Sequence, residues 1–130
     1  MSFALSRRSK EYRAGVDSRL IAISDLAIKL THVDFGHGPY SGLRTASQQY
    51  KLYKDAKSKC DGKNTRSKHQ DGMALDFYAF VNGKASWEER HLTAVATAFY
   101  EAAMRLGYRI RWGGFFGRTG WDKPHVELIE

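Results

Sequence analysis

The segment SKHQDGMALDFYAFV, from Ser67 to Val81, decides the fold because it passes from a polar turn into an aromatic-rich run of strand length. The polar part carries His69 and ends at Gly72, and the apolar part covers residues 73–81. The Asn82-Gly83 pair that follows is a strong signal for a tight hairpin turn. We therefore predict one strand over residues 73–81, with His69 just before its start.

Three stretches around this strand have the periodicity and the end signals of helices. The first begins at a cap, Asp17 or Ser18, and keeps an apolar stripe at three- and four-residue steps to near Thr31. The other two open at capping-box spacings and cover residues 45–56 and 86–107, and a glycine stands at the C-cap position of the last.

The remaining segments are short strands and loops. Residues 108–112 and 124–129 alternate between apolar and polar side chains, which predicts two more strands. The glycine-rich residues 34–42 and the basic, turn-rich residues 57–68 are predicted to be loops. Helices come first and short strands then interleave with a long helix, so we predict an α+β fold with N-terminal helices and a small antiparallel sheet.

Length, charge and cysteine content limit the class of protein. The 130 residues fit one domain over residues 1–130. Lys and Arg total 21 against 14 Asp and Glu, and the net charge of +7 favours a polyanionic partner such as nucleic acid, an anionic membrane or an anionic wall polymer. Cys60 is the only cysteine, which excludes a disulfide-rich scaffold. Residues 1–10 lack the apolar region of a signal peptide, and no stretch has the length and hydropathy of a membrane span.

Two of the five histidines lie beside carboxylates at predicted strand starts. His69 precedes Asp76 by seven residues, and Asp122 precedes His125 by three. Two His and one Asp can hold zinc in tetrahedral geometry and leave the fourth position to a water molecule, as a catalytic site requires. Spacing alone leaves open the alternative that each of these residues has an ordinary structural role, in a turn or at the surface.

Three motifs resemble those of a known enzyme family. Ser67-x-His-x-x-Gly-x-Ala-x-Asp76 resembles the SxHxxGxAxD signature of the D-Ala-D-Ala carboxypeptidase and L-Ala-D-Glu endopeptidase family of zinc peptidases. Asp122-x-x-His125 resembles the second element of that family, and Ser41–Thr45 (SGLRT) resembles its SGxR(S/T) segment. The N-terminal helix, with Leu5–Ser9 and Gly15-Val16, further resembles phage endolysins of the L-alanyl-D-glutamate endopeptidase type.

The resemblance implies a role for each matching residue and a fold of the hedgehog/D-Ala-D-Ala peptidase type. By position, His69, Asp76 and His125 are the implied zinc ligands. Asp122 takes the place of the catalytic acid, which is Glu in many relatives and Asp in some phage enzymes. Arg44 takes the place of an arginine that helps to hold or polarise the substrate in relatives, and the alternative is a surface arginine after a turn.

Further residues are candidates for the site on weaker grounds. Glu127 is two positions beyond His125 on the same strand face, so it can support that ligand, bind substrate or form an ordinary ion pair. His37, in the glycine-rich loop, is a candidate substrate-binding residue. His32 and His91 are expected to be structural or surface residues. Four aromatic residues are candidates either for the cleft wall or for the core: Tyr78, Phe80, Trp112 and Trp121.

The function implied by the resemblance is zinc-dependent hydrolysis of the L-Ala–D-Glu bond in peptidoglycan stem peptides, causing host lysis. We expect a monomer without a separate wall-binding domain, and the basic charge suits contact with an anionic membrane surface. Because no signal peptide is evident, the enzyme is expected to wait in the host cytoplasm until a holin-type protein gives it access to periplasmic peptidoglycan.

Three alternatives compete with this interpretation. A D-Ala-D-Ala carboxypeptidase of the same family would use the same motifs. A basic nucleic-acid-binding domain would use the same net charge, with residues 57–68 as a phosphate-contacting loop. That reading does not need two His and two Asp in a peptidase signature, so we expect no specific nucleic-acid partner. A cysteine peptidase is disfavoured because Cys60 lies in a lysine-rich turn without a nucleophile signature.

Overall fold

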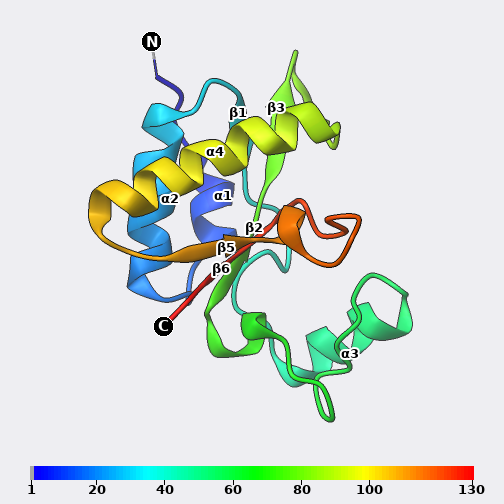
Figure 1. The fold of residues 1–130 in the computed structure, drawn as a ribbon. Helices are drawn as coiled ribbons and strands as arrows, with labels where there is room; N and C mark the ends of the chain where they lie inside the picture. The colour runs from blue at the N-terminus through cyan, green and yellow to red at the C-terminus, as the bar shows by residue number, and fades with distance from the viewer. Residues whose placement is uncertain (1) are drawn as a thin grey trace.

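Helices and short strands alternate along residues 2–130, which are the residues that this computed structural model describes (Figure 1). The α+β prediction is confirmed. In chain order the elements are α1 (Arg7–Tyr12), α2 (Ser18–Leu30), β1 (Asp34–Gly36), α3 (Ala46–Lys54), the 3-10 helix η1 (Lys68–Asp71), β2 (Ala74–Asp76), β3 (Tyr78–Val81), β4 (Lys84–Ser86), α4 (Glu89–Leu106), β5 (Ile110–Trp112), the 3-10 helix η2 (Gly113–Phe115) and β6 (His125–Leu128). Within residues 2–130, no helix has the length and apolar character needed to span a membrane.

The apolar stripes of α2 and α4 face each other and form the centre of the core. Leu20 and Ile23 of α2 and Val95 and Phe99 of α4 are completely buried, and Figure 1 shows α4 lying across α2. The Asp17 side chain accepts a hydrogen bond from the Arg19 N–H at the start of α2, which confirms Asp17 as the N-cap. Packing of these two amphipathic faces supplies the rigid base on which the strands rest.

The six strands form two separate three-stranded antiparallel sheets, in the orders β1-β3-β4 and β2-β6-β5. The single strand predicted over residues 73–81 is therefore wrong, because the chain leaves one sheet after Asp76 and enters the other at Tyr78. Phe77, between them, donates its N–H to the Pro124 carbonyl and stacks its ring on Phe99, with centroids 5.4 Å apart. The burial of Phe77 fixes the crossing point and places Asp76 at the junction of the two sheets.

Several local predictions are confirmed and others need correction. The Thr45 capping box and the turn between β3 and β4 are present as predicted. The capping box predicted at Ser86 is wrong, because Ser86 ends β4 and α4 begins at Glu89 without a side-chain cap. The predicted loop at residues 34–42 begins with the short strand β1. The loop prediction for residues 57–68 holds up to the start of η1.

Candidate metal centre and active-site cleft

The pairing of β2 with β6 brings Asp76 opposite His125. The N–H of Asp76 donates to Ser41 and the N–H of His125 donates to Asp122, so the two residues do not donate to one another across the ladder. Side chains in such a non-hydrogen-bonded antiparallel pair approach each other more closely than those of a hydrogen-bonded pair. The two side chains therefore converge on the same side of the sheet.

The third side chain of this cluster, His69, is presented by η1. The Ser67 hydroxyl caps this turn, and Gly72 ends it with φ of 70°, a left-handed conformation that favours glycine. The ring of His69 is almost fully buried and lies against that of His125, with centroids 5.1 Å apart. Two residues of the signature, Ser67 and Gly72, thus shape the turn that aims His69.

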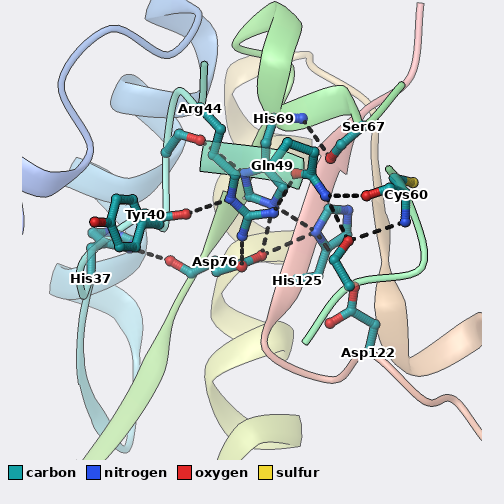
Figure 2. Close-up of polar contacts among 12 residues, drawn as sticks. His37, Tyr40, Arg44, Gln49, Cys60, Ser67, His69, Asp76, Asp122 and His125 are labelled. Carbon is teal, nitrogen blue, oxygen red and sulfur yellow. Dashed lines mark hydrogen bonds and ion pairs between the residues drawn. The ribbon is translucent and has the colours of Figure 1, made fainter. Parts of the chain in front are cut away.

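Three atoms that can ligate a metal ion face one another at the distances that a metal site requires (Figure 2). Oδ1 of Asp76 lies 3.1 Å from Nε2 of His69 and 3.0 Å from Nδ1 of His125, and the two ring nitrogens are 3.2 Å apart. Tetrahedral zinc with bonds of about 2.0–2.1 Å separates its ligand atoms by about 3.3 Å. The triangle formed by His69, Asp76 and His125 therefore fits a small divalent ion with little adjustment.

Hydrogen bonds on the far side of each imidazole fix its tautomer. Nδ1 of His69 lies 2.9 Å from the Gly42 carbonyl, and Nε2 of His125 lies 2.8 Å from Oε1 of Glu127. Both partners are acceptors, so those nitrogens carry N–H groups, and the opposite nitrogens face the centre, where each can bind a metal ion once it carries no proton. Such outer hydrogen bonds orient histidine ligands in metal sites. Glu127 occupies this supporting position, and Lys68 pairs with it at 3.2 Å.

The charges within the cluster keep its carboxylate ionised. Burial raises the pKa of Asp76, but His69 and His125 outweigh this effect and hold the pKa well below its usual range. Burial lowers the pKa of His125, but hydrogen bonds to Asp76 and Glu127 outweigh it and raise the pKa to about 10 in the metal-free chain. A metal ion that binds at Nδ1 of His125 must therefore displace a proton.

Arg44 lies at the edge of this cluster and touches Asp76. Its Nη2 donates to Oδ2 of Asp76 at 3.0 Å, while Nε donates to the Tyr40 carbonyl and Nη1 to the Gln49 side chain. The Arg44 backbone N–H also donates to the carbonyl of His69. The guanidinium thus holds the oxygen of Asp76 that faces away from the two histidines, and it retains N–H groups for a further ligand.

Asp122 lies beside the triangle of His69, Asp76 and His125 but does not belong to it. Its Oδ2 lies 3.7 Å from Nδ1 of His125, and the side chain is about one third exposed. Burial and the charge of Asp76 raise its pKa above the usual range. The loop is held by a close backbone approach at Gly113, where a Cβ atom would lie 1.9 Å from the Asp122 carbonyl oxygen. A side chain at position 113 would therefore displace Asp122.

An open cleft of about 500 Å³ surrounds these groups. The residues His69, Asp76, Asp122, His125, Glu127 and Arg44 all line it. Its outer wall comes from residues 56–60 and 66–68, together with Phe116 and Trp121. Five lining side chains are cationic and three are carboxylates, so the cleft attracts anionic groups. The cationic residues are Arg44, Lys57, Lys59, Arg66 and Lys68.

The prediction that His37 binds substrate is wrong. Its side chain is buried, with 1% of the residue exposed, and it does not line the cleft. Nδ1 of His37 lies 2.7 Å from the backbone carbonyl of Asp76, and Nε2 lies 2.8 Å from the Ser24 hydroxyl. Burial lowers the pKa of His37 to about 4. The ring therefore lies beneath Asp76, on the side away from the cleft.

The aromatic candidates divide between cleft and core. Trp121 lines the cleft at 48% exposure, and the ammonium of Lys59 lies 4.2 Å from its ring centroid. Trp112 is buried in the core, while Tyr78 and Phe80 do not line the cleft. Phe116 was not predicted from the sequence, but it lines the cleft, and its ring packs beside both Trp121 and His125. No local signal distinguishes Phe116 from its neighbours in a glycine-rich turn.

Cys60 and the remaining histidines carry no sign of catalytic chemistry. Cys60 lines the cleft, but partial burial and the charge of Asp61 raise the pKa of its thiol, which disfavours the nucleophilic thiolate. His32 is exposed. His91 lies in α4, where its Nδ1 contacts the Ser86 hydroxyl at 2.6 Å and the Glu88 carboxylate at 3.2 Å, and it does not line the cleft. The expectation that His32 and His91 are structural or surface residues agrees with these positions.

Comparisons with known proteins place the chain in a family. A family model described as phage L-alanyl-D-glutamate peptidase matches residues 1–129. The L-alanyl-D-glutamate peptidase of Escherichia phage T5 is 30% identical, over 99% of this chain and all of that protein. The crystal structure of the L-Ala D-Glu endopeptidase ChiX of Serratia marcescens matches with a TM-score of 0.83 and 30% identity, over 97% of this chain and 90% of that one. This chain therefore belongs to the phage L-alanyl-D-glutamate peptidase family.

Proposed function

We propose that this protein is a zinc-dependent peptidoglycan endopeptidase that hydrolyses the L-Ala–D-Glu bond of stem peptides and so lyses the bacterial host. The observation that carries the proposal is the triangle of donor atoms from His69, Asp76 and His125, spaced as in a tetrahedral site and lining an open cleft. The bond is suggested by the names of the relatives, which are L-Ala–D-Glu peptidases.

Zinc suits this set of ligands better than the hard cations do. Two imidazole nitrogens and one carboxylate oxygen are ligands that zinc takes in catalytic sites, whereas magnesium and calcium prefer sites made of oxygen atoms. When bound, zinc supplies Lewis-acid polarisation of the scissile carbonyl and lowers the pKa of a water molecule. The ligands come from three different elements, η1, β2 and β6, so the fold rather than local sequence would set the geometry.

Asp122 is the residue that we assign to proton transfer. It reaches the edge of the metal triangle and lines the cleft, and burial and the charge of Asp76 raise its pKa, so its carboxyl group holds a proton more readily than an ordinary carboxyl group does. Asp122 would take a proton from the attacking water and deliver it to the amine that leaves. Arg44 would use its remaining N–H groups to stabilise negative charge on the scissile carbonyl or to hold a substrate carboxylate.

The charge of the cleft supports an acidic stem peptide as the substrate. A glutamyl residue that is bonded through its amine and through one carboxyl group retains one free carboxylate. Lys57 and Lys59 lie on the cleft wall, and neither forms an ion pair with a residue in the part of the chain that the structure describes. These two ammonium groups are therefore available to attract that carboxylate.

The basic surface alone would equally suit a nucleic-acid-binding domain, but a ligand triangle of this kind has no role in phosphate contacts. A D-Ala-D-Ala carboxypeptidase remains the alternative within the same chemistry.

We further propose that residues 1–130 act as one monomeric domain and that the net charge of +7 assists contact with anionic membrane surfaces. Access to periplasmic peptidoglycan from the host cytoplasm would then require a holin-type release step.

Digestion of purified peptidoglycan tests the proposed function directly. The purified protein should release fragments with a new N-terminal D-Glu, identified by mass spectrometry. A chelator should stop the reaction and added zinc should restore it. Release of terminal D-Ala alone would favour the carboxypeptidase alternative, and undiminished activity in protein shown to be metal-free by elemental analysis would overturn the zinc assignment.

A further inference from the structure

The backbone of Asp76 lies at the point where the chain passes from one sheet to the other. Its N–H donates to the Ser41 carbonyl rather than to β6, and the next residue, Phe77, donates to Pro124 and starts the crossing to the other sheet. The carbonyl of Asp76 therefore lies where neither sheet offers it a partner. A buried carbonyl without a donor is costly, so a side chain that donates to it also fixes the course of the chain at this point.

His37 supplies that donor. Its Nδ1 lies 2.7 Å from the Asp76 carbonyl oxygen, which can only accept a hydrogen bond, so Nδ1 carries the proton. Nε2 is then an acceptor, and the Ser24 hydroxyl donates to it at 2.8 Å. Ser24 in turn accepts from the guanidinium of Arg13 at 3.0 Å, and Arg13 pairs with Asp25 at 2.6 Å. The donors and acceptors form one consistent chain.

The surroundings leave the His37 ring little freedom to move. Its backbone N–H donates to the Ser9 hydroxyl at 3.0 Å, which ties it to α1, while Ser24 ties the ring to α2. The rings of Phe35 and Phe99 pack against it edge-on, with centroids 5.7 and 6.4 Å away. Figure 2 shows His37 reaching the main chain of Asp76 from the side opposite to His69 and His125.

We propose that His37 is a positioning residue for the metal centre, because its Nδ1–H group fixes the main chain of Asp76 and thereby the direction of the ligating carboxylate. Ser24 and Arg13 complete this support by holding the tautomer of His37 and by tying α1 and α2 to the ligand. The inference rests on the proposed metal-binding function of Asp76. It differs from an ordinary core role because it predicts a change in metal affinity that a loss of packing alone would not produce.

Two substitutions at position 37 separate the two hydrogen bonds of the ring. The amide nitrogen of His37→Asn stands two bonds from Cβ, as Nδ1 does, and can still donate to Asp76. The amide nitrogen of His37→Gln stands three bonds from Cβ, as Nε2 does, and can reach Ser24 but not Asp76. We expect His37→Gln to bind Zn²⁺ about 10- to 100-fold more weakly, the usual effect of losing an outer hydrogen bond at a metal site. We expect His37→Asn to remain close to the wild type.

The readouts are Zn²⁺ affinity, from competition with a chromophoric chelator, and the visible absorption of the Co²⁺-substituted protein. The Co²⁺ spectrum reports ligand geometry, so it should change in His37→Gln and be retained in His37→Asn. Thermal unfolding of the metal-free proteins measures the packing loss common to both variants. Equal Zn²⁺ affinity and equal spectra for the two variants would overturn the proposal, even if both melt below the wild type.

Two more variants keep the test decisive if a position-37 variant fails to fold. Ser24→Ala removes the donor to Nε2 and should weaken Zn²⁺ binding by less than His37→Gln does, and an affinity identical to that of the wild type would count against the relay. His91→Gln is the matched control, because Nδ1 of His91 also contacts a hydroxyl but lies outside the cleft, and its affinity should not change. If the wild-type protein itself bound no Zn²⁺, the proposed function would fail rather than this inference.

Discussion

On the cleft side of Asp76, His69 and His125 each donate one N–H to an outer acceptor and turn the other nitrogen toward the carboxylate. On the buried side, His37 donates to the carbonyl of the same residue and accepts from a hydroxyl. The same type of side chain thus contacts Asp76 from both sides. Only on the cleft side do two ring nitrogens and a carboxylate oxygen converge on one point, where a metal ion can replace the protons between them.

The partners, rather than burial, distinguish the two sides. His125 and His37 are both buried, yet carboxylate partners raise the pKa of His125 to about 10, while burial without a carboxylate in hydrogen-bond contact lowers the pKa of His37 to about 4. A histidine that keeps a carboxylate within reach can exchange its proton for a metal ion. A histidine without one stays neutral and acts as a fixed donor and acceptor.

Removing a ligand on the cleft side should abolish function. His125→Ala leaves His69 and Asp76, and two ligands hold zinc poorly. We expect no zinc by elemental analysis and no detectable peptidoglycan lysis. Added zinc at 100 times the dissociation constant should stabilise the wild type by about 2.7 kcal/mol and leave the variant unchanged. A variant that kept one zinc per chain would show that His125 is not a ligand.

Removing the proton acceptor should leave the metal in place. Asp122→Asn keeps the size of the side chain, so it should fold and bind about one zinc, while kcat falls by ~10²- to 10⁴-fold. The expected separation of metal binding from turnover depends on the 3.7 Å gap between Asp122 and His125. Loss of zinc would make Asp122 a ligand, whereas near-normal turnover would shift the role to Glu127.

The sequence predicted the cluster on the cleft side of Asp76 far better than the contacts of His37 on the buried side. The signature places Ser67, His69, Gly72 and Asp76 within ten residues, and the turn geometry that it requires is local. The fold joins this segment to His125 by the register of β2 with β6. Residue type and spacing alone left an ordinary structural role open for each residue, and the resemblance to the peptidase signature supplied the assignment.

The strand break and the role of His37 could not be predicted because they depend on distant partners. Apart from Asp76, residues 73–81 are apolar or aromatic on both sides of Phe77, and the hydrogen bond to the carbonyl of Pro124 marks the break. His37 lies in a glycine-rich loop that has the composition of an exposed segment, and α1 and α2 bury it. One signal was available: Ser24 is a polar residue within the apolar stripe of α2, so it needed a buried partner.

Acid should destabilise the metal-free protein through the buried side. The folded-state pKa of His37 is about 4 against an ordinary value of 6.5. Between these two pH values the unfolded chain therefore binds a proton at His37 that the folded chain does not bind. The resulting stability is complete above about pH 6.5 and is lost as the pH falls toward 4, by at most about 3 kcal/mol. Denaturant unfolding at a series of pH values should show this slope for the wild type and a shallower one for His37→Asn. Parallel slopes would show that His37 is charged in the folded chain.

The smallest expected effect is a change in KM that comes from the lysines at the cleft wall. This effect should depend on salt concentration, whereas the effect of His37 on the buried side of Asp76 should not. Lys57 and Lys59 are exposed, so their attraction for a substrate carboxylate acts through water and weakens as ions screen it. Replacing both with Gln should raise KM by roughly three- to tenfold at low ionic strength, equivalent to about 1 kcal/mol, with kcat nearly unchanged. At high salt the difference in KM should disappear.

A stem peptide whose free glutamyl carboxylate is amidated should show the same higher KM with the wild type. The variant should show no further rise in KM with this peptide, because the interaction is already absent. Lys84→Gln, on β4 and outside the cleft, serves as the control for a change in net charge. The zinc affinity change of His37→Gln, in contrast, should persist at high salt, since His37 itself is buried. If the lysine effect persisted at high salt, or if Lys84→Gln raised KM as much, Lys57 and Lys59 would not form a carboxylate site.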